Sequence, residues 1–164
     1  MSIRTVATAV MGVVVITGVM IAAVHWIPLD PCTLGTPVER YKETVDFLST
    51  TMELVLGLCT GLLGLSAAVL IGIQGNLKLS NWSMFFTLLS MIAIAASVLC
   101  AILWKFQISN LWFNGCYELV GTMRIQALYR MHFCFFLLGV LLLAIVVALV
   151  AFERLKETAS GGTS

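Results

Sequence analysis

Four long apolar runs constrain the fold of this sequence more than any other feature. A helix needs about 20 residues to cross the hydrocarbon core of a bilayer, and each run is long enough. Backbone amides in hydrocarbon must find hydrogen-bond partners within their own segment, so each run is expected to be helical. The expected spans are 5–27, 52–74, 84–104 and 132–152. The sequence therefore predicts an all-α integral membrane protein with four transmembrane helices.

Composition and charge indicate that the lipid bilayer is the main solvent of this chain. Its 164 residues are 60% hydrophobic and 10% charged, whereas about a quarter of the residues in soluble proteins are charged. The net charge of +1 offers no basic surface, so no nucleic-acid partner is expected. Glu53, at the start of the second run, is the only charged residue in the four runs. Because proton and ion paths use charged groups near the midplane, coupled transport is disfavoured.

The ends of the runs suggest a topology. Arg4 before the first run also fits a signal peptide, but a signal core is only about 7–15 residues long, so a retained helix is favoured. With four helices, the loops 28–51 and 105–131 share one side of the membrane and both termini share the other. The density of Lys and Arg beside the spans favours cytoplasmic termini. We therefore expect a multi-pass protein of the cell membrane with its long loops outside.

The first long loop contains a helix start. Thr36, Pro37 and Glu39 match a capping box with proline at the first helical position. Apolar residues then recur at steps of three and four and run into the second span, which predicts one continuous helix. This apolar stripe comprises Val38, Tyr41, Val45, Leu48, Met52 and Val55. Its first four members form a candidate exterior interface.

A weaker stripe precedes the fourth span. Val120, Met123, Ala127 and Met131 have helical spacing, and Asn114 is a candidate N-cap. The second and fourth helices are therefore expected to extend about fifteen residues, or about 22 Å, beyond the membrane. These extensions would form a small helical cap from residues 28–51 and 105–131. Residues 1–152 would then be a single four-helix domain, with 153–164 as a short flexible tail.

Two of the five cysteines fall in the long loops. Cys32 lies four residues before Thr36, and Cys116 lies where the second extension begins. Both are expected near the top of the cap, and the connecting chain is long enough to reach at about 3.3 Å per residue. A Cys32–Cys116 disulfide is predicted if the cap faces an oxidising compartment, the alternative being two unrelated thiols. The remaining cysteines fall inside spans, where a thiol packs as a small apolar group.

Small residues in the second and third spans recur four apart, a spacing that lets helix backbones approach closely. These candidate helix-packing residues are Gly57 and Gly61 on one face of the second span, Gly64, Ala68 and Gly72 on an adjacent face, and Ala93, Ser97 and Ala101 in the third span. We expect them to pack inside the bundle or against a partner.

These features favour a non-enzymatic structural or partner-binding subunit that contacts another membrane protein or a second copy of itself. No catalytic, cofactor or metal site is expected, because neither a nucleophile–base constellation nor a set of ligand residues with suitable spacing is present. One alternative is an oligomeric pore-forming or membrane-perturbing effector lined by Thr60, Ser66, Ser90 and Ser97. A second is a thiol-redox enzyme that uses Cys32 and Cys116, although the sequence has no Cys-x-x-Cys pair.

Overall fold

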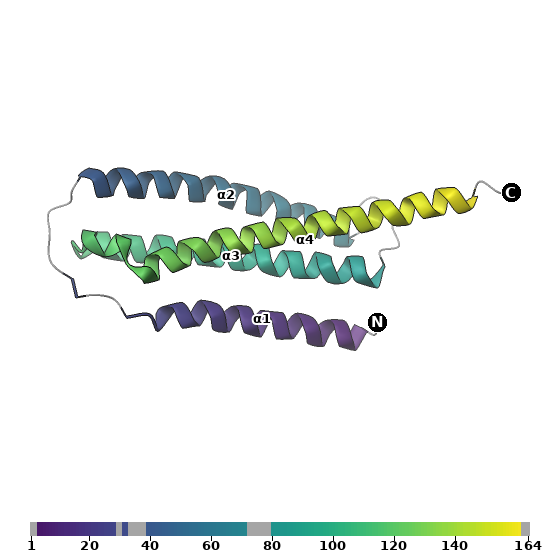
Figure 1. The fold of residues 1–164 in the computed structure, drawn as a ribbon, viewed down its shortest axis with the longest axis horizontal. Coiled ribbons are helices and arrows are strands. Elements are labelled where there is room, and N and C mark those ends of the chain that lie inside the picture. The colour runs from purple at the N-terminus through teal and green to yellow at the C-terminus, as the bar shows by residue number, and fades with distance from the viewer. Residues whose placement is uncertain (1–2, 29–30, 33–38, 72–79, 162–164) are drawn as a thin grey trace.

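The described part of the chain is almost entirely helical. The computed structural model describes residues 3–28, 31–32, 39–71 and 80–161, and these contain no β-strand. The elements are α1 (Ile3–His25), α2 (Glu39–Ile71), α3 (Asn81–Phe113), the 3-10 helix η1 (Tyr117–Gly121) and α4 (Met123–Gly161) (Figure 1). All four α-helices are long and apolar enough to cross a membrane. The predicted all-helical fold with four candidate membrane spans is confirmed.

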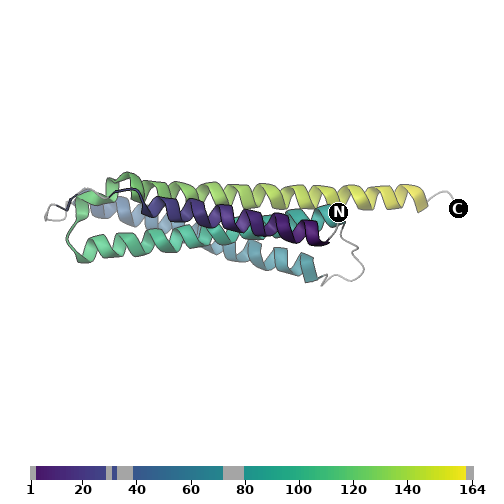
Figure 2. The ribbon, with the colours of Figure 1, turned by 90° about the horizontal axis from the view of Figure 1, so that it is seen from below.

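The helices run along one axis, with α3 at the centre of the contacts. It packs most extensively against α4 and next against α2, whereas α1 contacts α3 and α4 but, among the described residues, not α2 (Figures 1 and 2). The start of α1 and the end of α4 lie at one end of the bundle, while η1 lies at the other (Figure 1). This arrangement agrees with the predicted sharing of one side by the two termini.

A 3.5-residue repeat on α3 explains why this helix is central. Its buried residues include an unbroken series at alternating steps of four and three: Ser83, Thr87, Ser90, Ile94, Ser97, Ala101, Trp104, Ile108 and Leu111. Such a repeat keeps one face of a slightly supercoiled helix against its neighbours. On α2 the same spacing relates Met52, Val55 and Cys59, which are buried. The three central helices therefore pack as a coiled-coil-like bundle, onto which α1 is added.

The length of α3 differs from the prediction. The third span was expected to end at Trp104, and only the second and fourth helices were expected to continue past their spans, but α3 continues to Phe113. The nine residues after Trp104 contain neither glycine nor proline, and Ile108 and Leu111 continue the buried face. No change of period or helix breaker therefore stops α3 at the expected position.

The helix start predicted at Asn114 is wrong. Asn114 is instead the C-cap of α3, and its backbone N–H bonds to the carbonyl of Asn110. Gly115 then turns the chain with φ 69°, a left-handed conformation that glycine adopts without strain. Five residues of η1 follow, and α4 begins only at Met123. Gly115 and Gly121 thus divide the expected single extension into a turn, a 3-10 helix and the start of α4.

Two further differences concern stretches near the predicted boundaries. Met123, expected on the buried stripe, is 77% exposed, because α4 starts there in a different register. Residues 153–161, expected as a flexible tail, belong to α4; the sequence ERLKETAS consists mostly of good helix formers. The predicted capping box at Thr36 and Pro37 lies outside the described residues, as do Val38 and Gly72.

Candidate functional site

The end of the bundle that contains η1 has a hydrophobic core, here the cap core, to which every helical element contributes. Four of its members, Val24, Met52, Ala101 and Trp104, lie within the expected spans rather than in the expected exterior segments. Trp104 is almost completely buried, and its ring lies 5.7 Å from that of Tyr129. The buried members of this core are Val24, Met52, Ala101, Trp104, Ile108, Leu111, Cys116, Leu119, Val120, Ile125 and Leu128. The upper ends of the helices are therefore held together by packing as well as by the polypeptide connections.

An ion pair lies at the base of this cap. The Lys105 Nζ atom on α3 donates a hydrogen bond to Glu53 Oε1 on α2. Below the pair, α2 has no charged residue from Leu54 to Ile71, and α3 has none from Asn81 to Trp104. The pair thus marks where the uncharged helix segments end. From there α2 rises another fourteen residues to Glu39, about 21 Å at 1.5 Å per residue.

At the top of the cap the two loop cysteines are adjacent. The Sγ atoms of Cys32 and Cys116 lie at disulfide-bonding distance, and the two Cα atoms are 5.4 Å apart, within the range of about 4.4–6.8 Å that disulfides adopt. Cys116 is 7% exposed and belongs to the cap core, and its N–H bonds to the carbonyl of Leu111. The structure therefore brings together the two cysteines that the sequence predicts as partners.

The candidate exterior interface on α2 is partly used within the chain. Val45 and Leu48 pack against the cap core, whereas Tyr41 is 37% exposed. The apolar stripe of α2 therefore faces α3, η1 and α4 of the same chain, and only part of it stays exposed. Among the described residues, two grooves lie beside the part of α2 that precedes Glu53, one on each side of the helix.

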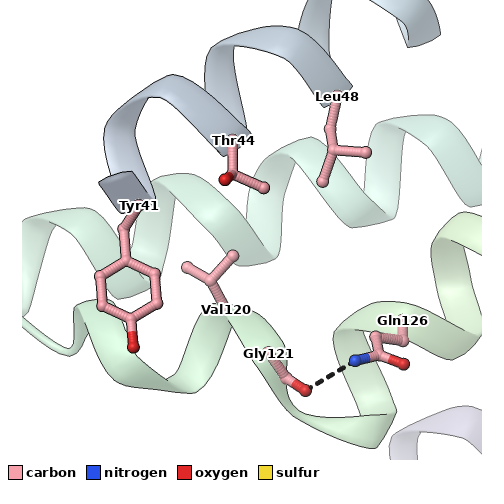
Figure 3. A pocket seen from close by; sticks show the side chains of 6 residues that line it. All are labelled: Tyr41, Thr44, Leu48, Val120, Gly121 and Gln126. Atoms are coloured by element: carbon pink, nitrogen blue, oxygen red, sulfur yellow. Dashed lines mark hydrogen bonds between the residues drawn. The ribbon is translucent and has the colours of Figure 1, made fainter. Parts of the chain in front are cut away.

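The first groove, here the η1 groove, lies between α2 and the η1–α4 corner (Figure 3). Side chains from α2 point toward Val120 of η1, and Gln126 Nε2 of α4 donates a 2.9 Å hydrogen bond to the carbonyl of Gly121. The groove has a volume of about 370 Å³ and is lined by Tyr41, Thr44, Leu48, Val120, Gly121 and Gln126. Its walls carry no charged side chain.

The second groove, here the α3 groove, lies between α2 and the upper part of α3 and also has a volume of about 370 Å³. Phe113 at its edge is 91% exposed, the largest exposed fraction among the bulky apolar side chains described. The groove is lined by Lys42, Val45, Asp46, Ile108, Ser109, Trp112 and Phe113. It combines an aromatic-rich floor with one charge of each sign on the α2 side.

The two sets of small residues have different environments. Ala93, Ser97 and Ala101 on α3 are buried inside the bundle, as one reading of the sequence expected. On α2, a Cβ atom added at Gly57, Gly61 or Gly64 would meet nothing within 4 Å. These α2 glycines are exposed, as are the flanking Leu54, Leu58 and Leu65. Among the described residues, these glycines therefore make no close contact with another helix of the chain.

The structure also reveals a close approach of α3 and α4 that the sequence did not single out. A Cβ atom on Gly139 would lie 2.5 Å from Ile94 Cγ1, so only glycine fits there without a shift. The hydroxyl of Ser90 donates a 2.8 Å hydrogen bond to the Gly139 carbonyl. The sequence did contain a hint of this approach, a single glycine within a leucine-rich span. It could not show that Ile94 of α3 is the residue that Gly139 contacts.

A polar junction of α2, α3 and α4 lies just below the cap. Ser97 Oγ and His132 Nδ1 are 2.9 Å apart, and Ser97 Oγ also lies 3.8 Å from Cys59 Sγ. Both Ser97 and His132 are completely buried. A serine beside a histidine resembles a nucleophile and its base, but catalysis needs access for a substrate, which this burial denies.

The residues proposed to line a pore have different environments. Of the four proposed pore-lining residues, Ser66, Ser90 and Ser97 are fully buried within the chain and only Thr60 is exposed.

Cys59 and Cys100 are buried free thiols, and Cys134 is an exposed one. Within the described ranges, no group of three or more His, Cys, Asp or Glu side chains could hold a metal ion.

No protein-family model, curated protein or solved structure matches this chain. Its function is therefore inferred from the chemistry and placement of its own residues.

Proposed function

We propose that this chain is a non-enzymatic, multi-pass subunit of the cell membrane that binds another protein through its cap. The cap would face the oxidising exterior, where the Cys32–Cys116 bond persists, and both termini would be cytoplasmic. The observation that carries the proposal is the α3 groove, an open apolar surface above the ion pair with Phe113 exposed at its edge.

The distance of this groove from the expected membrane surface favours a protein partner over lipid as the molecule that covers it. Phe113 lies eight residues beyond Lys105, about 12 Å along the helix. The polar layer of a bilayer is only about 5–8 Å thick on each side of the hydrocarbon. An aromatic side chain so exposed above that layer is typical of a protein-binding surface, where aromatic residues are enriched.

The glycine face of α2 supports a second contact inside the membrane. Gly57, Gly61 and Gly64 leave a shallow channel open beside exposed leucines. Small residues at this spacing allow a neighbouring transmembrane helix to approach closely. A partner that spans the membrane would then be held at two heights, by the α3 groove outside and by α2 within.

Photo-crosslinking in native membranes tests this proposal. A photoreactive amino acid at Phe113 or Gly61 is expected to give discrete adducts, because each would lie against the partner. Matched control positions are Glu118, exposed on η1, and Val147, 62% exposed on α4. The Phe113→Ala variant is expected to lose the partner on purification in mild detergent while keeping the disulfide. Equal labelling at all four positions, with no discrete adduct, would contradict the proposal.

A further inference from the structure

His132 links α4 to α3 through a reciprocal pair of hydrogen bonds. The hydroxyl of Ser97 on α3 donates to the His132 backbone carbonyl over 2.9 Å. In return, His132 Nδ1 lies 3.0 Å from the Ser97 backbone carbonyl oxygen. Each side chain therefore bonds to the backbone of the opposite helix, and the pair fixes the register of α3 against α4.

These contacts favour a proton on the Nδ1 atom of the ring. A backbone carbonyl oxygen only accepts hydrogen bonds, so the Nδ1 atom of His132 must be protonated to bond to Ser97. In the neutral ring the other nitrogen, Nε2, then has a free lone pair. The Nε2 atom is buried and has no hydrogen-bond partner among the described residues. His132 thus holds an unoccupied basic site inside the bundle.

The surroundings of His132 offer no carboxylate to an added positive charge. Its direct polar contact is Ser97, with the Cys59 thiol of α2 behind that serine, and its ring lies against Phe133. The titratable or charged groups nearest to the junction along the packed helices are Glu53 of α2, Cys100 and Lys105 of α3, and Arg124, Tyr129, Arg130 and Cys134 of α4. The remaining ones lie further along, within residues 39–46 of α2 and 153–157 of α4. Glu53, the acid nearest to Cys59 along α2, is already engaged by Lys105. The described side chains of α1 include no titratable group.

We propose that His132 is a proton-sensitive latch between α3 and α4, opened by protonation of Nε2 from the cap side. An imidazolium ion in this junction would have a second N–H donor with no acceptor, whereas water accepts that bond once the helices separate. Protonation therefore favours the separated helices. Arg130 is exposed and lies two residues nearer the cap than His132. The path for a proton from the water on that side to His132 is therefore short.

The sign and size of the effect follow from linkage. The stability contributed by neutral His132 is fully present well above about pH 6.5, where an exposed histidine is half protonated, and it decreases progressively as the pH falls below that value. A single proton can raise the unfolding equilibrium constant by up to about tenfold for each pH unit. Acidification outside the cell would thus loosen α4 from α3 just below the cap.

Thermal unfolding of the full chain in lipid nanodiscs, followed between pH 7.5 and 5.5, tests the latch. Wild type is expected to lose stability across this range. The His132→Gln variant keeps an amide donor but cannot be protonated, so its stability is expected to stay constant. The sequence has one other histidine, and the matched control His25→Gln should behave like wild type. Equal acid sensitivity in His132→Gln and wild type would overturn the proposal.

A second measurement applies even if His132→Gln does not fold. In wild-type protein labelled with 15N-histidine, the Nδ1–H tautomer is expected at pH 7.5, with Nε2 unprotonated. Protonation of that ring at pH 5.5 should coincide with loss of the α3–α4 contacts. A ring that is protonated while α3 and α4 stay packed, or one that is protonated at Nε2 already at pH 7.5, would refute the latch.

Discussion

The Cα atoms of Cys32 and Cys116 lie 5.4 Å apart, although 84 residues of chain separate them. This contact ties the connection between α1 and α2 to the turn that follows α3. It matters most for α1, of whose described side chains only Ile21 and Val24 are buried. The disulfide therefore supplements a small packing area at the cap end of α1.

Removal of this bond is expected to destabilise the protein and to alter its electrophoretic mobility. In the chain-entropy model a loop of this size contributes up to about 4 kcal/mol, and the membrane lowers that figure by restricting the unfolded chain. The double variant Cys32→Ser/Cys116→Ser should lack the mobility difference that reduction produces in wild type, and should unfold at a lower temperature. Cys134→Ser, at an exposed free thiol, is the control. Identical gels and melting curves for the double variant and wild type would contradict this.

The Gly139→Ala substitution is expected to destabilise the bundle by about 1–3 kcal/mol, the usual cost of overpacking. The new methyl group would collide with Ile94. Gly61→Ala is the matched control, because nothing lies near the added methyl there. Combining Gly139→Ala with Ile94→Ala should cost less than the sum of the two single changes, measured by thermal unfolding. Strict additivity would mean that the two helices are further apart than described.

Leu128→Ala is expected to cost about 2–5 kcal/mol, because Leu128 is 1% exposed in the cap core. Leu138→Ala on the same helix is the control, since Leu138 is 46% exposed. Denaturant titration of both variants in detergent measures the difference. Similar losses at both positions would argue against a packed exterior core.

The Glu53→Gln substitution is expected to leave the unfolding midpoint nearly unchanged. The Lys105 and Glu53 side chains are 37% and 63% exposed, and exposed ion pairs contribute little because water and salt screen them. A double-mutant cycle with Lys105→Met, repeated at low and high salt, measures the coupling. A large, salt-insensitive coupling would show instead that lipid shields this pair.

The sequence revealed spans more readily than packing faces, for a physical reason. On α2, the exterior stripe from Tyr41 to Leu48 stands out because charged residues separate its apolar members. Inside the membrane every face of a helix is apolar, so that contrast disappears. The buried face of α3 contains many small residues, such as Ser90 and Ser97. Only Ala93, Ser97 and Ala101 among them were predicted to share a packing face. The extension of α3 was missed for a related reason, because its end depends on Gly115 rather than on a change in hydropathy.

Four long helices, the scarcity of charge in the expected spans and the possible pairing of Cys32 with Cys116 could all be predicted from the sequence alone. Run length, the cost of burying charge and chain reach are all local quantities that can be counted along the chain. Only the tertiary structure decided that the α2 glycines face outward, that Gly139 meets Ile94 and that His132 bonds to Ser97. Those relationships depend on the rotation of one helix against another, which is set by side-chain packing between segments distant in the sequence.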